Sequence, residues 1–401
     1  MGYLDKDTDV HTNHNVYILG AGFSKNAGMP VLKDFLNEMR SSVNWLKAGR
    51  RSELDATRKV LLFRKSAASA ALRVNMNVEN IEDLFSLAAA SGEESAADNI
   101  STAIAATIEY CRQEAKQSSL LDVAVSKNST PPISWKKTNE GDETKTKFKA
   151  QLYDLYAGFL NGDLCDAQEY MNNTIITFNY DTVLEDALMN IQVPIDYGFQ
   201  QDWTIYDDSW PKPDPKKKAL KLLKIHGSVN WFQNQRELQN VTIYRSYELG
   251  VNKDKMPSRH VAIVPPTWRK DFSGPLSDVW RESIHALRDA TRIIFVGFSF
   301  PDTDAHIKYL LAAGLQENIS LRNIYCINPV ESVKDNFMKI IKTDLEEQKI
   351  AVFCPGYTSR LLNRFAGEYD SFPTLFNRAI SANFAITQFT LAGEKPAFGS
   401  A

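Results

Sequence analysis

RIIFVGF (residues 292–298) and IYCIN (324–328) are the two stretches that decide the fold class of this chain. Each is a short apolar run without the alternation of apolar and polar side chains that marks a half-exposed strand. Strands that helices cover on both faces have this pattern, because neither side of the strand meets water. We therefore predict an α/β fold with a parallel sheet and helices on both faces.

Further patterns extend this architecture along the chain. Strands are also expected at 16–20, 174–178, 222–226, 261–264 and 350–353, and helices at 30–39, 51–116, 148–171 and 334–348. The polar stretch 117–147 is expected to be a loop or linker. A chain of 401 residues is too long for one minimal domain. The predicted organisation is an α/β domain (1–40 and 172–385), a helical insertion (41–171) and a loose tail (386–401).

Composition excludes several classes of function. A net charge of −3 gives no electrostatic case for a nucleic-acid partner, so direct nucleic-acid binding is not expected. The N-terminus has no apolar core of a secretory signal, and no apolar run is long enough to cross a bilayer. We therefore expect a cytoplasmic protein without membrane association. The cysteines have no CxxC spacing and are expected to be free thiols, with no metal site: Cys111, Cys165, Cys326 and Cys354.

The turn GAGFS (20–24) follows the first predicted strand and precedes a helix that is expected to begin at Pro30. Gly20 and Gly22 permit a tight turn and let the backbone approach a pyrophosphate. The sixth position of GAGFSK is Lys25 rather than glycine, so the standard dinucleotide fingerprint is not met. A plain strand-to-helix turn is the alternative interpretation.

Two other predicted strands end in polar residues that could carry chemistry. TFNYD (177–181) would place Asn179 and Asp181 at the carboxyl edge of the sheet, where open α/β sheets bind ligands. Both could instead cap the following helix. KIHGSVNW (224–231) places His226 before Gly227, and an imidazole suits proton transfer near neutral pH. A structural histidine is the alternative.

Two later loops offer groups for a phosphate or a ribose. Gly297 and Ser299 follow the strand at 292–297, where the glycine gives room and the serine a hydroxyl. Asn328 ends the next strand, where its amide could reach a ribose hydroxyl or an adenine edge. Glycine, serine and asparagine are common turn residues, so each loop alone also fits an ordinary turn.

The five segments in this order resemble the sirtuin family, and most closely its bacterial sirtuin-like NAD-hydrolase branch that acts in anti-phage defence. GAGFS resembles the sirtuin GAGxS turn, TFNYD the TQNID segment, and KIHGSVNW the HG segment. GFSFPDTDAHIKYLL (297–311) resembles the GTS segment, and INP (327–329) the segment whose asparagine contacts the adenosine ribose. The resemblance covers about 16–40 and 174–330 and implies a Rossmann-like NAD-binding domain.

The resemblance also implies roles for individual residues. The turn Gly20, Ala21, Gly22, Phe23 and Ser24, with Pro30, Gly227, Gly297 and Ser299, would bind NAD, and Asn328 its adenosine ribose. Asp181 would hold the nicotinamide carboxamide, Asn179 would order the nicotinamide ribose or the attacking water, and His226 would accept a proton from a ribose hydroxyl. NAD would be the substrate and not a resident cofactor.

One departure from the family decides between activities. Sirtuin deacylases normally carry a zinc module with two CxxC pairs, whereas this chain has no cysteine between Cys165 and Cys326. Water is then the simpler acceptor, which predicts an NAD glycohydrolase that releases nicotinamide and ADP-ribose and depletes NAD on infection. An NAD-dependent protein deacylase and a non-catalytic NAD or ADP-ribose sensor are the alternatives.

Relatives of this kind imply a homo-oligomer, with an ATPase partner or a phage-derived trigger. The sequence leaves the trigger and the cyclic or linear form of the product open.

Overall fold

A computed structural model describes most of the chain between residues 14 and 358, together with one short segment near the C-terminus. The described residues are 14–91, 96–115, 121–126, 136–137, 145–161, 172–200, 203–205, 210–211, 219–234, 237–254, 259–267, 274–301, 305–328, 330, 332–342, 345, 350–354, 357–358 and 390–391.

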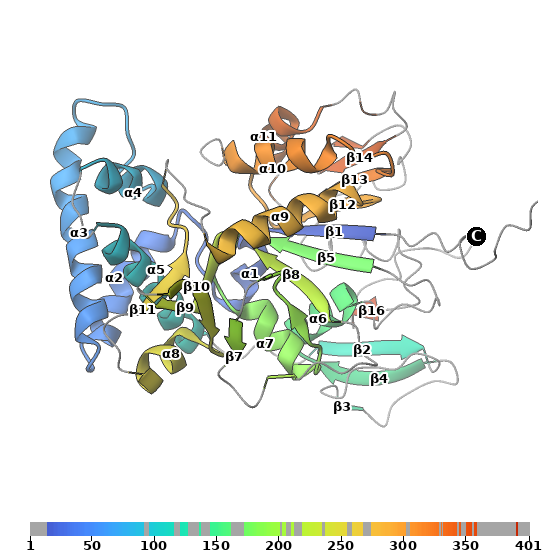
Figure 1. Ribbon diagram of the computed structural model, residues 1–401, viewed down its shortest axis with the longest axis horizontal. Coiled ribbons are helices and arrows are strands. Elements are labelled where there is room, and N and C mark those ends of the chain that lie inside the picture. The colour runs from blue at the N-terminus through green and yellow to red at the C-terminus, as the bar shows by residue number, and fades with distance from the viewer. Residues whose placement is uncertain are drawn as a thin grey trace, which may run out of the picture.

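A sheet of eight strands forms the centre of the molecule (Figure 1). Its spatial order is β15-β14-β13-β12-β1-β5-β8-β6, and every neighbouring pair is parallel except β14 and β15. The strands are β1 (His14–Leu19), β5 (Asn172–Thr177), β6 (Ile195–Asp196), β8 (Leu220–Lys224), β12 (Arg292–Val296), β13 (Asn323–Ile327), β14 (Ala351–Cys354) and β15 (Tyr357–Thr358). The predicted α/β fold class is confirmed.

The central strands end in one row. Leu19 at the end of β1 pairs with Val296 of β12 on one side and with Thr177 of β5 on the other. Thr177 in turn pairs with Lys224, the last residue of β8. The chain proceeds from β1 to one side of the sheet and later returns to β12 on the other, so the topological switch point lies at β1. In open α/β sheets a switch point of this kind is where ligands bind.

Helices cover both faces of this sheet. The connections through α6 (Leu152–Asn161) and α7 (Val183–Asn190) run from β1 towards β8, whereas those through α9 (Pro275–Arg288), α10 (Ala305–Leu315) and α11 (Val333–Ile340) run the opposite way. Because crossovers between parallel strands are right-handed, the two groups lie on opposite faces. Figure 1 shows α9, α10 and α11 together on one side and α6 and α7 together on the other.

Both faces of the strands are therefore buried. All six residues of β1 are buried, and in β12 only Arg292 is partly exposed. Burial on both faces explains why these runs lack a polar alternation in the sequence. The strands pack into one apolar cluster with α6, α7, α9 and α10.

A second sheet leaves the first one directly after β8. Its four strands have the order β11-β9-β10-β7, and the described bounds are β7 (Trp203–Ile205), β9 (Gly227–Asn234), β10 (Glu237–Ile243) and β11 (Arg259–Ile263). Only Ile225 and His226 separate β8 from β9. The strand predicted at 261–264 thus exists but belongs to this second, mainly antiparallel sheet, because β11 pairs with β9.

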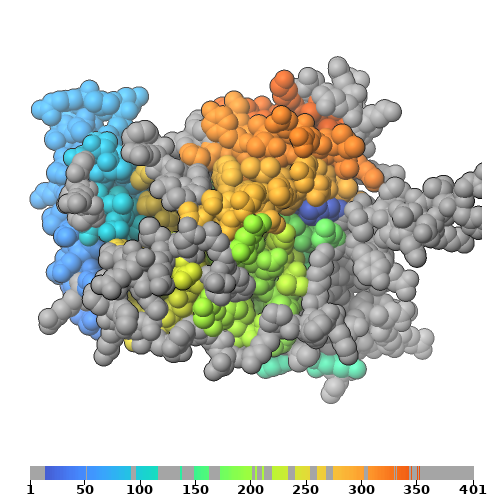
Figure 2. Space-filling view, viewed as in Figure 1, coloured from blue at the N-terminus to red at the C-terminus, as the bar shows by residue number. Residues whose placement is uncertain are grey.

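A group of helices packs on the second sheet and forms one end of the molecule (Figures 1 and 2). These helices are α2 (Phe35–Leu46), α3 (Arg51–Ala71), α4 (Ile81–Ala90), α5 (Ala96–Glu114) and α8 (Tyr247–Asp254). Their apolar side chains form a second cluster with Val229, Phe232 and Ile263 of the sheet. The helices predicted within 51–116 are confirmed. Helix α2 begins at Phe35 rather than Pro30, because residues 31–35 form i→i+3 turns.

Several boundaries differ from the sequence prediction. The expected loop 117–147 is wrong in part, since β2 (Leu121–Ser126), β3 (Lys136–Lys137) and β4 (Lys145–Ala150) lie there in a third sheet. The fourth strand of that sheet, β16 (Thr390–Leu391), lies in the tail that was expected to be loose. Pairing with a segment so far along the chain leaves no local signal. The helix expected at 148–171 starts after β4, and its residues 162–171 lie outside the described part of the chain.

Gly227 is the first residue of β9, where the chain passes from the main sheet to the second sheet, and the backbone of β11 lies directly against it. Its φ of 78° lies in the left-handed region, and an added Cβ would lie 1.9 Å from the carbonyl oxygen of Ala262. Gly49 also has a positive φ, 113°, but an added Cβ there meets nothing within 4 Å.

This pair of glycines gives a direct test of the junction. Gly49→Ala is expected to lower the free energy of unfolding by about 1–2 kcal/mol, the cost of the left-handed backbone alone. Gly227→Ala adds a backbone clash to that cost and is expected to lower it further. Urea unfolding of both variants measures the difference, and equal midpoints would show that β11 does not approach residue 227 so closely.

Candidate functional site

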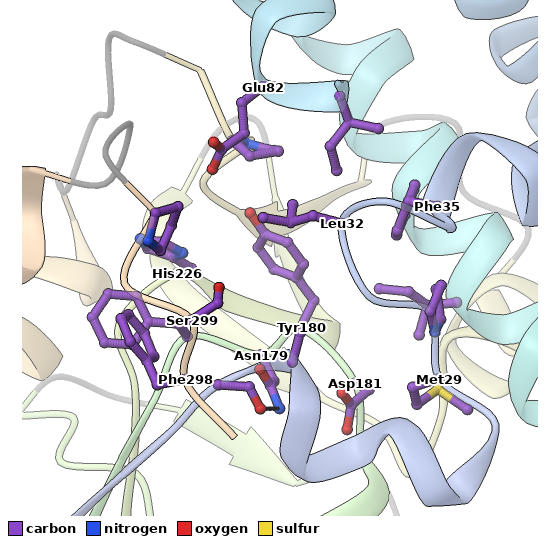
Figure 3. A pocket seen from close by; sticks show the side chains of 18 residues that line it. Met29, Leu32, Phe35, Glu82, Asn179, Tyr180, Asp181, His226, Phe298 and Ser299 are labelled. Atoms are coloured by element: carbon purple, nitrogen blue, oxygen red, sulfur yellow. Dashed lines mark hydrogen bonds between the residues drawn. The ribbon is translucent and has the colours of Figure 1, made fainter. Parts of the chain in front are cut away.

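A cleft opens at the carboxyl ends of the central strands, between the main sheet and the helical group (Figure 3). The lining residues are Gly20, Ala21, Met29, Pro30, Leu32, Phe35, Ile81, Glu82, Ile108, Phe178, Asn179, Tyr180, Asp181, His226, Pro266, Phe298, Ser299 and Pro301.

Four loops that follow neighbouring strands supply the polar side of this cleft. Gly20 and Ala21 follow β1, residues 178–181 follow β5, His226 follows β8, and Ser299 follows β12. The loops converge because their strands end in register. Seven of the predicted site residues therefore line one cleft: Gly20, Ala21, Pro30, Asn179, Asp181, His226 and Ser299.

The glycines behind the cleft let two loops touch. Gly22 donates its backbone N–H to the carbonyl oxygen of Gly297 at 2.9 Å. A Cβ on Gly20 would lie 2.6 Å from Cα of Phe298, and one on Gly297 would lie 2.3 Å from the backbone nitrogen of Phe23. The close approach at Gly22 and Gly297 is thus between loops of the protein, and neither glycine lines the cleft. Gly20 makes a close contact of this kind and also lines the cleft.

A chain of hydrogen bonds joins the β1 and β5 loops. Asn179 donates from Nδ2 to the carbonyl oxygen of Gly20 at 3.0 Å and to Oγ of Ser24 at 3.2 Å. Ser24 donates from Oγ to Oδ1 of Asp181 at 3.0 Å. Oδ1 of Asp181 also accepts the backbone N–H of Val183 at 3.1 Å. Asp181 thus accepts the first backbone N–H of α7 and also lines the cleft, but the N-cap of this helix is Thr182 and not Asp181. Ser24 itself is buried and acts behind that wall.

A buried ion pair supports this loop from below. Nζ of Lys224 donates to Oε1 of Glu185 at 2.6 Å, and the two side chains are only 1% and 2% exposed. The same ammonium group also donates to the backbone carbonyl oxygen of Asp181. Removing one partner of a buried pair leaves an uncompensated charge, which typically costs about 3–5 kcal/mol. Because Lys224 also contacts the backbone of Asp181, the pair holds Asp181 in position at the end of β8.

Burial shifts the acidity of both carboxyl groups here. Desolvation raises the pKa of Asp181 above its ordinary value, and the nearby Lys224 and the hydrogen bond from Val183 offset part of the rise. Desolvation likewise raises the pKa of Glu185, with Lys224 opposing it. A carboxyl group with a raised pKa in a cleft is typical of functional sites, although structural ion pairs share this property.

Two aromatic rings enclose the imidazole of His226. The Phe178 ring meets it edge to face with centroids 5.0 Å apart, and the Tyr180 ring stacks near it at 6.1 Å. Tyr180 is held in turn by its hydroxyl, which donates to the carbonyl oxygen of Val264 at 2.7 Å. The backbone N–H of Val264 donates to the carbonyl oxygen of His226 at 2.8 Å. The imidazole therefore has a fixed position in the cleft and is 5% exposed.

Ser299 is presented to the cleft by its neighbours in sequence. Phe298 and Phe300 are buried and pack against each other and against Phe295, whereas Ser299 between them is exposed. Asn328 lies behind this loop: its Nδ2 donates to the carbonyl oxygen of Phe298 at 3.0 Å, and its Oδ1 accepts the N–H of Val330 at 2.9 Å. Asn328 is buried and does not line the cleft, nor do the predicted residues Phe23 and Gly227.

The opposite wall comes from residues that the sequence prediction missed. Apolar side chains of the 29–35 segment and of α4 and α5 form most of it: Met29, Leu32, Phe35, Ile81 and Ile108. Glu82, from the first turn of α4, adds a carboxylate to this wall. In the sequence, Asn80 before the apolar run of α4 is a helix-start signal. That signal gives the position of the helix but not the cleft that it faces.

Two of the four cysteines have described side chains. Cys111 and Cys326 are buried and reduced, as expected, while the side chains of Cys165 and Cys354 lie outside the described residues. Burial raises the pKa of Cys111 to about 12, so its thiol stays protonated at neutral pH. No group of three or more metal-ligating side chains occurs among the described residues. Within the same residues, no helix has the length and apolar content of a membrane span.

Comparison with known proteins finds a family that is similar to part of the chain. Residues 173–349 match the family described as a SIR2-like domain. The matched segment contains the loops that carry Asn179, Asp181, His226 and Ser299. It starts after the Gly20 turn and after α2, α3, α4 and α5, and it includes α8. No curated protein matches the chain.

Solved structures of sirtuins are similar to the chain over most of its length, at low identity. A sirtuin studied for its substrate affinity is 12% identical, with 95% of this chain and 99% of that chain covered and a TM-score of 0.38. A Sir2 protein bound to an inhibitor, 2'-O-acetyl-ADP-ribose and a deacetylated peptide is 14% identical over 93% and 94% of the two chains, with a TM-score of 0.36. A Sir2 homologue in complex with NAD is 12% identical over 82% and 84%, with a TM-score of 0.31.

Asp181→Asn tests whether the charged form of this carboxyl group lowers the free energy of unfolding. A carboxyl group whose pKa is raised on folding contributes stability that is present below its ordinary pKa of 3.8 and is lost as pH rises through the folded-state value. The amide keeps an acceptor for Ser24 and Val183 but carries no charge. The variant is therefore expected to gain stability relative to the wild type as pH rises from about 4 to 8.

Chemical denaturation across this pH range measures the gain. Asp196→Asn is the matched control, because Asp196 accepts the backbone N–H of Gly198 at 2.8 Å in the same way that Asp181 accepts that of Val183. A constant difference between Asp181→Asn and the wild type at every pH would contradict the prediction.

Proposed function

We propose that the cleft binds NAD and that the protein hydrolyses the bond between nicotinamide and ribose. The observation that carries the proposal is the meeting of Asn179, Asp181 and His226, from two separate loops, in one cleft beside the turn after β1. The match of residues 173–349 to a SIR2-like domain supports the same ligand class. An amide, a carboxylate and an imidazole in a partly apolar cleft suit a ligand that has both a sugar and an aromatic ring.

The polar wall suits the sugar and phosphates of such a ligand. Ala21 and Gly20 bring backbone groups to the cleft, and Ser299 brings an exposed hydroxyl. The apolar wall around Phe35 and Ile81 suits a flat ring. We assign the carboxamide of nicotinamide to the side of Asp181. Asn328 would act on the ligand only through the Phe298 carbonyl loop that it holds.

Cleavage of the nicotinamide–ribose bond has a clear electronic demand. The bonding electron pair leaves with the ring nitrogen, which becomes neutral, and positive charge develops on the ribose. Negative and polar groups aimed at that charge lower the barrier. The side-chain oxygen of Asn179 is suited to this task, because its Nδ2 is already committed to Gly20 and Ser24. His226, which lies between Phe178 and Tyr180, would accept a proton from a ribose hydroxyl.

Water is the acceptor that fits this chain best. The two CxxC pairs of a sirtuin zinc module have no counterpart, since no cysteine lies between Cys165 and Cys326. The products would be nicotinamide and ADP-ribose. Depletion of NAD in anti-phage defence, a homo-oligomer and an ATPase partner or phage-derived trigger stay predictions from the sequence resemblance.

The test follows NAD loss by the purified full chain. Wild type is expected to consume NAD and release nicotinamide, and His226→Ala to lower kcat by about 10²–10⁴-fold, the usual contribution of a general base. Asn179→Ala is expected to cause a loss of about 10²-fold or more, as removal of a donor or acceptor at developing charge does. His260→Ala is the matched control, because His260 lies on β11 near Asp98 and outside the cleft.

Other outcomes separate the alternatives. NAD consumption that requires an acetyl-lysine peptide would identify a deacylase. A sensor would bind NAD or ADP-ribose tightly without turnover. In that case His226→Ala would bind the ligand and respond to it as the wild type does. Wild type that neither binds nor consumes NAD would refute the proposal.

A further inference from the structure

Glu82 is a buried carboxylate in the cleft to which the mechanism above gives no task. It is 9% exposed and lines the cleft together with Asn179 and His226. Figure 3 shows its side chain extending into the cleft from α4, with the carboxylate directed to the side where His226 lies. In the same view Asn179 and Asp181 lie at the other end of the cleft.

The position of Glu82 is fixed by the start of α4. Oδ1 of Asn80 accepts the backbone N–H of Glu82 at 2.9 Å, which caps the helix. The neighbours Ile81, Leu84 and Phe85 are at most 3% exposed and anchor α4 in the helical cluster. The N-terminal turn of a helix favours negative charge. Glu82 is therefore a carboxylate on a rigid element, held where charge is favoured and facing a cleft.

We propose that Glu82 is the general base that accepts a proton from the water attacking the ribose. The inference rests on the proposed function and adds a residue to it. The bond between ribose C1' and the ring nitrogen breaks, and its electron pair leaves with nicotinamide. A water oxygen bonds to C1', and one of its protons passes to the carboxylate of Glu82 and then to solvent. The products are nicotinamide, ADP-ribose and one proton, so charge and atoms balance.

Two observations favour this task over a purely structural one. Glu82 and Asp181 lie at opposite ends of the cleft in Figure 3, and a displacement at C1' needs the incoming water and the leaving ring on opposite sides. The second is that the reaction needs two bases. In the proposed function His226 accepts the proton of a ribose hydroxyl, so the attacking water needs another base. A carboxylate or an imidazole can fill either role.

The decisive experiment is rescue of Glu82→Ala by formate. Removal of the carboxylate is expected to lower NAD hydrolysis by about 10²–10⁴-fold. The Kd for NAD, measured by calorimetry, is expected to stay near the wild-type value. Sodium formate supplies a small carboxylate to the vacated space and is expected to restore a large part of the rate. Glu82→Gln fills the space without a base, so its rate is expected to stay low with formate present.

Asp83→Ala is the matched control on the same helical turn. Asp83 accepts the backbone N–H of Asn77 at 3.0 Å through Oδ2 and does not line the cleft. This variant reports any effect of disturbing the start of α4, and its NAD hydrolysis is expected to match the wild type and to be insensitive to formate. Thermal unfolding of all variants shows whether they are folded.

The outcomes separate this inference from the proposed function. Wild type without NAD hydrolysis refutes the proposed function and Glu82 with it. Active wild type with an equally active Glu82→Ala refutes only the role of Glu82. A loss in Glu82→Ala that formate does not restore, or that Asp83→Ala shares, assigns Glu82 to the fold and also overturns the inference.

Discussion

The common end of the central strands is the constraint on which the rest of the structure depends. Backbone hydrogen bonds hold β1, β5, β8 and β12 in parallel, and Leu19, Thr177, Lys224 and Val296 lie in one row. Each of the four loops therefore starts at the same level. Their convergence needs no long-range side-chain contact, because the ladder hydrogen bonds bring them together. Glycines at 20, 22 and 297 then allow two of the loops to touch through their backbones.

The site that results contains charged groups that are buried away from water. Asp181 sits above the buried pair of Lys224 and Glu185, and burial raises the pKa of both carboxyl groups. Replacement of a buried ion pair by apolar residues is often neutral or stabilising. The pair is better explained by its contact with the Asp181 carbonyl, which fixes the loop that carries Asn179.

The sequence predicted the parallel sheet and the polar loops because both leave local signals. Apolar runs such as RIIFVGF show burial on both faces, and residues directly after a strand must lie at its end. The strand spacing therefore led to Asn179, Asp181, His226 and Ser299 on one cleft. The purpose of Gly22 and Gly297 was not visible, since a glycine needed for loop contact and one needed for a phosphate look alike. Glu82 and the apolar wall depend on how the helical group packs, and β2–β4 pair partly with residues near the C-terminus. Neither has a signature within a short window.

The cleft has walls that belong to two different apolar cores. Its polar wall grows from the core of the main sheet, and its apolar wall from the core of α2, α4 and α5. At the boundary, the guanidinium of Arg112 on α5 lies 3.9 Å from the carboxylate of Asp186 on α7. Substitutions in the helical core can therefore change the shape of the cavity while the strand ends stay untouched. A scaffold with this division would let close relatives acquire new ligand preferences by repacking a bundle, without rebuilding the machinery beside it.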